Sequence, residues 1–356
     1  MYGDIVGENT FLIYKHKILH KVFITIFCFY MGGYAKEVFR LFVQNYTSMH
    51  RILITGANGL LGQKLIQALF KEDNIVFLAT GAGPLRLQKS GIPYAIMDIT
   101  QKEEVEQVCG AFKPTAIIHA AAMTHVDACE KEPEKCWAAN VTAVQHLVDY
   151  CEKHGVFLVH LSTDFIFDGT EGPYAEEAEP KPLSVYGRSK AEAETLVKAM
   201  HAPWAILRTV LVYGYTEGLS RSNIVLWARQ ALLSGQPLRV VNDQWRTPTL
   251  AEDLAWACLA AVKLQAQGVF HISGAETYGI ADLVRAVAGF YEIPNPPITE
   301  VSSEELAQPA QRPPRTGFII EKARKILGFE PTPLLEGLKL IESQIAHDPA
   351  LASNTN

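Results

Sequence analysis

The sequence predicts an α/β fold in which a doubly wound parallel sheet is joined to a smaller C-terminal subdomain. Short apolar runs alternate with segments of helical periodicity from residue 51 to about residue 214, a pattern typical of parallel strands joined by crossover helices. The strands are almost continuously apolar, as expected when helices cover both faces of a sheet. Beyond residue 214 the alternation loosens and proline becomes frequent, which indicates a part built differently.

The expected elements follow one another in a regular order. Because strands separated by helices pair in parallel through right-handed crossovers, each helix is expected to return the chain to the same edge of the sheet. We expect strands at 51–55, 74–80, 94–99, 114–122, 156–162, 204–214 and 268–274, and helices at 60–72, 101–112, 133–154, 223–234 and 250–265.

Composition excludes several classes of protein. The chain has 356 residues, of which 48% are hydrophobic and 20% charged, and a formal net charge of -6. This length is sufficient for a large core, and the absence of a basic excess argues against a nucleic-acid partner. The six cysteines are scattered without a C-x-x-C pair, so they indicate buried thiols in a reducing, cytoplasmic environment. No spacing of His, Cys or carboxylates indicates a metal site.

A glycine-rich loop joins the first strand to the first helix. In "TGANGLLG", Gly56, Gly59 and Gly62 are spaced three apart. Glycine at these positions permits a tight turn, close approach of the backbone to a pyrophosphate, and packing of the helix near the sheet. The spacing differs from the usual G-x-G-x-x-G, and a glycine-rich turn without a ligand is the alternative. The context of strand and helix favours a dinucleotide site.

The end of the second strand bears on which dinucleotide binds. NAD-binding proteins usually carry a carboxylate there for the ribose 2'-hydroxyl, whereas this chain has Thr80, Gly81 and Ala82, followed by Arg86. A guanidinium can pair with a 2'-phosphate, which favours NADPH, while NADH and a merely solvated Arg86 remain the alternatives.

Two further strand ends contribute to the predicted cofactor site. Asp98 closes the third strand, where a carboxylate can accept a hydrogen bond from the adenine amine; a helix N-cap is its alternative role. The fourth strand ends in Ala120, Ala121 and Ala122, whose small side chains leave room for the nicotinamide half of a cofactor or simply pack.

A tyrosine and a lysine lie on one face of a predicted helix. Tyr186 and Lys190 are four residues apart in "SVYGRSKAEAE", and Thr163 ends the fifth strand, at the edge where doubly wound folds bind ligands. An ammonium near a phenol favours phenolate, so Lys190 is expected to lower the pKa of Tyr186. These groups suit carbonyl reduction, with the tyrosine moving a proton and the threonine holding the carbonyl.

Several blocks in this order resemble the extended short-chain dehydrogenase/reductases, and within them the dTDP-4-dehydrorhamnose reductases. The resemblance covers roughly residues 50–343 and includes "ILITGANGLLGQKL", "IIHAAAMTHVDACE", "LSTDFIFDGT", "YGRSKAEAE", "VVNDQWRTPT" and "RPPRTGF". It implies a Rossmann-like fold, an NAD(P)-dependent oxidoreductase and a nucleotide-linked 4-keto sugar as substrate, in dTDP-rhamnose or related sugar biosynthesis.

The resemblance also implies the residues of the site. The implied catalytic residues are Thr163, Tyr186 and Lys190. The cofactor, NADPH or NADH, is expected to contact Gly56, Asn58, Gly59, Leu60, Leu61, Gly62, Asp98, Ile99, Ala120, Ala121, Ala122, Tyr186 and Lys190. The substrate is expected to contact Thr124, Thr163, Asp164 and Arg246.

Departures from the family pattern bear on the reaction and the sugar. Related sugar-nucleotide dehydratases carry Thr-Asp-Glu where this chain has Thr163, Asp164 and Phe165, so the missing second acid favours reduction over dehydration. Asp164 is then expected to support the loop or the substrate. The family often has a tryptophan at the position of Leu211. It usually shows a small residue inside the block where Trp245 and Arg246 precede Thr247 in this chain. Both departures leave the identity of the sugar open.

The boundaries follow from these assignments. Residues 1–49 contain an apolar run at 22–35, which is too short to predict a membrane span with confidence. We expect residues 1–49 to be an extension outside the fold, with a signal peptide as the alternative. We predict a dinucleotide-binding domain at 50–215, a mainly substrate-binding subdomain at 216–345 with segments that return to the sheet, and a tail at 346–356.

Other functions remain open at this point. A non-catalytic regulatory subunit of the methionine adenosyltransferase beta type and a sugar-nucleotide epimerase share the same fold. Arg246, Arg312 and Arg315 are candidates to pair with a diphosphate, or are plain surface charges. We expect no membrane partner. A homodimer is compatible with the sequence, and Mg²⁺, which some relatives use at a dimer contact, is not assigned to any residue.

Overall fold

A computed structural model describes residues 50–87, 89–218 and 222–348. The predicted extension at 1–49 and the tail from residue 349 onward lie outside the described residues. Within the described part, no helix is long and apolar enough to cross a bilayer.

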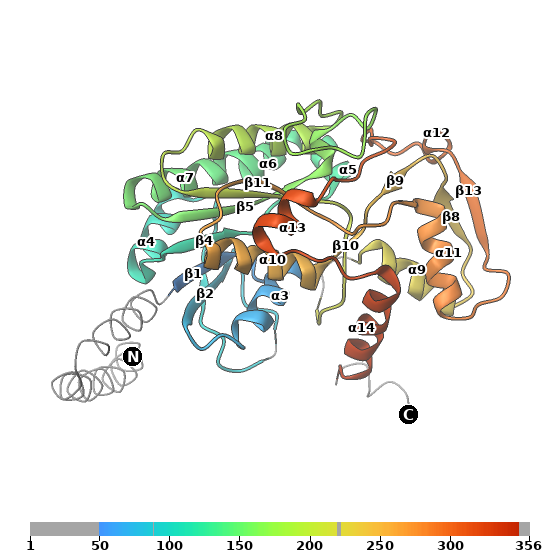
Figure 1. The fold of residues 1–356 in the computed structure, drawn as a ribbon, viewed down its shortest axis with the longest axis horizontal. Helices are drawn as coiled ribbons and strands as arrows, with labels where there is room; N and C mark the ends of the chain where they lie inside the picture. Colours follow the sequence, from blue (N-terminus) through green and yellow to red (C-terminus); the bar gives the residue numbers. More distant parts are fainter. Residues whose placement is uncertain (1–49, 88, 219–221, 349–356) are drawn as a thin grey trace. The chain divides into compact units, whose positions relative to one another are not determined.

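A seven-stranded parallel sheet forms the centre of the fold (Figure 1). Its spatial order is β11-β6-β5-β4-β1-β2-β3, so the order reverses where β1 pairs with both β2 and β4. This confirms the predicted doubly wound α/β class, in which ligands generally bind outside the carboxyl ends of the strands where the order reverses. The strands are β1 (His50–Thr55), β2 (Ile75–Gly81), β3 (Tyr94–Ile96), β4 (Ala116–His119), β5 (Phe157–Thr163), β6 (Trp204–Thr209) and β11 (Gly268–Ile272).

Helices cover both faces of the sheet. On one face, apolar side chains such as Ile54 and Val159 share a core with α3 (Leu60–Leu69), α10 (Ala251–Leu264) and α13 (Glu321–Leu327). On the other face, Leu53 and Leu158 share a core with α4 (Lys102–Phe112), α7 (Ala143–His154) and α8 (Val185–Lys198). This two-sided burial explains why the strands are apolar at nearly every position.

The C-terminal part has a core of its own. Residues of α9 (Ile224–Leu233), β8 (Leu238–Val241), α11 (Ile280–Phe290) and α14 (Leu334–Ala346) pack together, and β8 pairs in parallel with β13 (Ile298–Val301). The strand β11 nevertheless belongs to the large sheet, where it pairs with β6. The remaining short elements are α5 (Val126–Lys131), α6 (Pro133–Trp137), β7 (Val212–Tyr213), β9 (Trp245–Arg246), β10 (Thr249–Leu250), β12 (Tyr278–Gly279) and α12 (Ser303–Leu306).

Four elements differ from the expectation. The fourth strand covers Ala116–His119 instead of 114–122, so Ala120, Ala121 and Ala122 follow the strand and do not end it. The single helix expected at 133–154 is interrupted by a π-helical turn, Ala138–Thr142, in which Asn140 Nδ2 donates to the carbonyl of Met123 and to Ser189 Oγ. The strand expected at 204–214 breaks between β6 and β7, where Leu211 has a φ of +42°. The third strand stops at Ile96 instead of residue 99.

Candidate active site

The glycine loop packs directly on the segment that follows β4. Gly56 has a φ of +74°, and a Cβ there would lie 2.7 Å from the backbone nitrogen of Ala121. A Cβ at Gly62 would lie 2.2 Å from the carbonyl oxygen of Gly56. Only glycine fits these two contacts. The first turn of α3 has neither an acidic residue nor a side-chain cap, so its amides are suited to an anionic group such as a pyrophosphate.

The predicted adenine end of the site is organised by Asn58 and Asp98. Asn58 Nδ2 donates to the carbonyl of Pro84 (2.9 Å), and Asn58 Oδ1 accepts from the backbone nitrogen of Arg86 (2.9 Å), so the glycine loop holds the loop after β2. The Arg86 side chain is exposed. Asp98 Oδ1 accepts from the backbone nitrogen and hydroxyl of Thr100. The N-cap position of helix α4 is Gln101, whose side chain makes no capping hydrogen bond.

The three predicted catalytic residues lie together at the carboxyl edge of the sheet. Thr163 ends β5, while Tyr186 and Lys190 lie one turn apart in α8, which packs against β5. The helix begins at the N-cap Ser184, whose hydroxyl accepts from the backbone nitrogen of Gly187 (3.1 Å). All three side chains are buried.

The electrostatics of the tyrosine differ from the expectation. Burial raises the pKa of Tyr186; a hydrogen bond with Thr163 opposes this effect and the charge of Asp164 adds to it. Burial also lowers the pKa of Lys190, to about 8. The pKa of Tyr186 is therefore raised and not lowered as expected, because desolvation of the phenol outweighs the effects that oppose it. The Nζ atom of Lys190 lies 3.1 Å from His160 Nε2.

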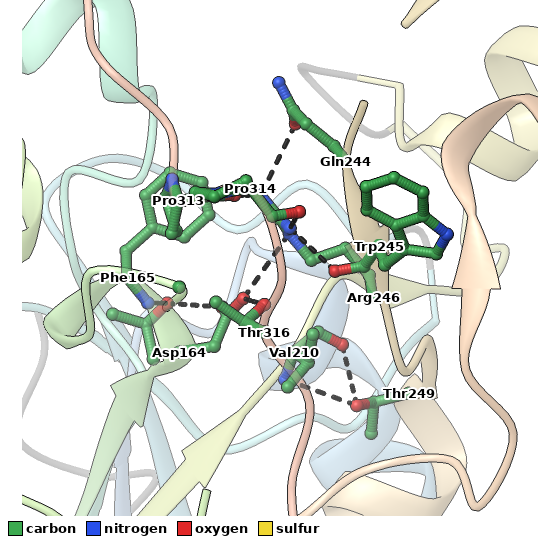
Figure 2. Close-up of polar contacts among 12 residues, drawn as sticks. Asp164, Phe165, Val210, Gln244, Trp245, Arg246, Thr249, Pro313, Pro314 and Thr316 are labelled. Atoms are coloured by element: carbon green, nitrogen blue, oxygen red, sulfur yellow. Dashed lines mark hydrogen bonds and ion pairs between the residues drawn. The ribbon is translucent and has the colours of Figure 1, made fainter. Parts of the chain in front are cut away.

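Asp164 is buried in a network that reaches the C-terminal part of the chain, as Figure 2 shows. Its Oδ1 accepts from the hydroxyl of Thr163 at 3.1 Å, and its Oδ2 accepts from the hydroxyl of Thr316. The Nε atom of Arg246 lies 3.6 Å from Oδ2. Burial raises the pKa of Asp164, against the opposing charge of Arg246. In this arrangement Asp164 holds the hydroxyl of Thr163 through a hydrogen bond.

The Arg246 guanidinium points at backbone carbonyls (Figure 2). It is 2% exposed and donates to the carbonyls of Trp245 (2.7 Å) and Pro313 (2.7 Å), with a longer contact to that of Pro314 (3.3 Å). Because its donors are used in this way, the structure does not support the prediction that Arg246 contacts a substrate. Burial is the main influence on its pKa, which is lowered.

The remaining predicted site residues differ from one another in exposure and in their contacts. Thr124 is exposed in the loop after β4, and Ile99 is buried. Arg312 is paired with Asp127 at 2.8 Å, while Arg315 is exposed. A separate cavity of about 100 Å³ is lined by residues that include Tyr213, Pro248, Tyr278, Pro331 and Leu334, and it is lined by none of the predicted site residues.

Sequence reasoning missed the residues that surround the triad. His160 contacts Lys190. The side chains of Asn140 and Ser189 form a hydrogen bond with each other. Gly187 lets α8 approach the turn after β5, because a Cβ at this position would lie 2.2 Å from the carbonyl oxygen of Phe165. A polar residue inside an apolar strand, such as His160, was the feature of the sequence that could have indicated these residues.

Comparison with known proteins gives consistent results. A family model described as the RmlD substrate binding domain matches residues 49–346. The methionine adenosyltransferase 2 subunit beta of Xenopus tropicalis is 31% identical over 294 residues, which are 81% of this chain and 86% of that protein.

Two solved structures are similar over nearly their whole length. A dTDP-4-dehydrorhamnose reductase from Clostridium acetobutylicum is 29% identical, with a TM-score of 0.73, and the match covers 83% of this chain and 99% of that one. The dTDP-4-dehydrorhamnose reductase of Bacillus anthracis, solved in complex with NADP, is 27% identical, with a TM-score of 0.70 and the same coverage. The resemblance predicted from the sequence is thereby confirmed.

Proposed function

Because this chain belongs to the RmlD substrate binding domain family, we propose that it is an NAD(P)H-dependent reductase of a nucleotide-linked 4-keto sugar. The finer assignment, a reductase of the dTDP-4-dehydrorhamnose type in dTDP-rhamnose or related sugar biosynthesis, is part of this proposal. The observation that carries it is the joint burial of Thr163, Tyr186 and Lys190 beside the carboxyl ends of the strands.

The residues present fit a nicotinamide dinucleotide. The backbone of the glycine loop, Gly56 to Gly62, offers amides at the start of α3 for the pyrophosphate, and the backbone of Ala120 and Ala121 packs against Gly56 of the same loop. NADPH is the preferred form in this proposal, because Arg86 is exposed in the loop that Asn58 holds. When bound, the reduced nicotinamide supplies a hydride for a carbonyl carbon.

The side chains of the triad divide the remaining work. Burial keeps the phenol of Tyr186 protonated at neutral pH, so it is ready to donate to the oxygen of a carbonyl. The positive charge of Lys190 stabilises the phenolate that this transfer leaves. The Thr163 hydroxyl, which donates to Asp164, can rotate to hold the carbonyl.

Phe165 favours reduction over dehydration. Its ring lies edge-on to that of Tyr186, with the centroids 5.9 Å apart, at the place where a dehydratase would carry a second acid. An apolar ring cannot exchange protons, so elimination of water has no acid or base at this position.

The function is tested with purified protein and a panel of 4-keto sugar nucleotides. Each is offered with NADPH and with NADH, and the absorbance of the reduced nicotinamide is followed. We expect oxidation with at least one member of the panel and faster turnover with NADPH. If no member of the panel causes oxidation of the reduced nicotinamide, the reductase proposal is wrong.

A second candidate function is a non-catalytic regulatory subunit. The 31% identity to the methionine adenosyltransferase 2 subunit beta favours it. This reading expects no oxidation of NADPH with any keto sugar nucleotide, together with copurification of a stoichiometric partner. The same panel therefore separates the two functions.

Replacement of Arg86 tests the choice of cofactor. In Arg86→Ala we expect the Kd for NADPH to rise about five- to tenfold, because a charged hydrogen bond to the 2'-phosphate is lost. The Kd for NADH should be unchanged. Both are measured by titration of the nicotinamide fluorescence. Arg239→Ala, which removes an exposed arginine of β8, is the matched control and should leave both constants unchanged. An equal loss for both cofactors would mean that Arg86 does not read the phosphate.

Replacement of Gly187 tests the close approach of α8 to the turn after β5. A Cβ in Gly187→Ala would lie 2.2 Å from the Phe165 carbonyl oxygen, so the helix must shift and carry Tyr186 with it. We expect kcat to fall about 10²-fold. Gly110→Ala in α4, where a Cβ meets no atom within 4 Å, is the control and should retain full activity. Normal kcat in Gly187→Ala would show that Tyr186 tolerates the shift.

A further inference from the structure

A row of polar side chains crosses one face of the sheet on the side of α8. Thr55 of β1 is in register with His119 of β4, which is in register with His160 of β5. Both histidines are at most 1% exposed, and their rings stack with centroids 5.3 Å apart. Neither has a place in the reaction as described above, and buried imidazoles inside apolar strands need a reason.

The two histidines have different partners. His119 Nδ1 and the hydroxyl of Thr55 form a hydrogen bond of 2.7 Å, within the sheet. Lys190 Nζ lies 3.1 Å from His160 Nε2. Lys190 has only donors, so His160 Nε2 must be the acceptor. Burial lowers the pKa of His160 well below its ordinary value, which keeps the ring neutral and able to accept.

We propose that His160 is a positioning residue for Lys190: its neutral imidazole accepts a hydrogen bond from the buried ammonium and holds it, charged, beside Tyr186. The inference rests on the proposed reductase function, since it states how that lysine is kept in its working state. His160 and Thr163 lie three residues apart on β5, so one strand sets the place of both the carbonyl-holding hydroxyl and the lysine.

The other charged and titratable groups near Lys190 do not replace this contact. Glu194, the next turn of α8, binds Arg208 and Lys198. Cys136 of α6 interacts with Asn140 and Ser189. Tyr186 and His119 complete the surroundings. Among the described residues, His160 Nε2 is the one acceptor with a hydrogen bond to the lysine nitrogen.

Loss of this acceptor has a definite sign. Burial already lowers the pKa of Lys190 to about 8, because the charged form is poorly solvated. Without the imidazole the charged form is disfavoured further, so the pKa falls. Reduction needs the ammonium, which means that activity is lost as pH rises through this pKa. The alkaline limb of the pH profile of kcat/KM must therefore move to lower pH.

The test compares three substitutions at His160. His160→Leu removes the acceptor, His160→Asn places an amide near the position of Nδ1, too short to reach Lys190, and His160→Gln places an amide oxygen near Nε2. For Leu and Asn we expect the alkaline limb to move down by about one pH unit, the size expected for one hydrogen bond to a charged group. Gln should restore most of the wild-type profile. His119→Leu, the matched neighbour, should not move it.

A second readout does not require activity. The side-chain titration of Lys190 is followed by NMR with labelled lysine, assigned with Lys190→Arg, and should show the same downward shift in the Leu and Asn variants. If His160→Leu does not fold, the contrast between Asn and Gln decides. Reduced turnover with an unmoved pH midpoint and an unmoved lysine titration would overturn the proposal. If the wild type reduces no keto sugar, the NMR titration still decides the contact, so the two failures are distinguishable.

Discussion

The Tyr186→Phe variant is expected to lose about 10²- to 10⁴-fold in turnover of a 4-keto sugar nucleotide while its affinity for NADPH stays close to that of the wild type. The substitution removes one hydroxyl and keeps the ring. That ring packs with Cys129, Cys136 and Phe165, so the fold around it is preserved. What disappears is the acid that the carbonyl oxygen needs. Turnover is measured by nicotinamide absorbance and affinity by fluorescence titration.

A matched tyrosine separates this effect from a general loss of a hydroxyl. Tyr278 lies in β12, and its hydroxyl donates to Glu276 and to none of the three catalytic residues. Tyr278→Phe should therefore retain turnover. Near-normal turnover in Tyr186→Phe would show that another group donates the proton and would remove the assignment of the triad.

Most of the fold could be predicted from local patterns in the sequence. Apolar runs, helical periodicity and the glycines of the loop at Gly56 to Gly62 are properties of short segments, and the parallel sheet follows from them through chain connectivity. The pair Tyr186 and Lys190 was also accessible, because a spacing of four residues on a helix places both on one face. The assignment of site roles and the domain boundaries remain predictions.

Contacts between segments that are distant in the sequence could not be predicted from these local patterns. The burial of Arg246 depends on carbonyls at residues 313 and 314, nearly seventy positions along the chain, so its sequence context suggested an anion ligand instead. The contact of His160 with Lys190 depends on how α8 lies on the sheet. The π-helical turn at Asn140 likewise depends on bonds to Met123 and Ser189. Tertiary packing decides such features, whatever the local propensity.

The Glu194→Gln variant is expected to lose about 3–5 kcal/mol of the free energy of unfolding at pH 7. Glu194 lies one turn after Lys190 in α8, and both carboxylate oxygens accept from Arg208 of β6, at 2.8 and 2.7 Å. Both side chains are 1% exposed. A neutral amide leaves the guanidinium of Arg208 buried without its counter-charge, and that desolvated cation is the source of the cost. Chemical denaturation measures the loss.

The pH dependence identifies the ion pair as the cause. Burial alone would raise the pKa of Glu194, but the hydrogen bonds and charge of Arg208, with the charge of Lys198, lower it to about 2. A carboxyl whose folded pKa is depressed contributes stability that is present above its unfolded pKa, near 4.5, and is lost as pH falls toward 2. The difference between wild type and Glu194→Gln should therefore shrink in acid. Glu192→Gln, exposed on the same helix, should cost less than about 0.5 kcal/mol at every pH. A difference that does not change with pH would instead indicate a packing effect of the amide, and the anchoring of α8 would then not depend on the charge of Glu194.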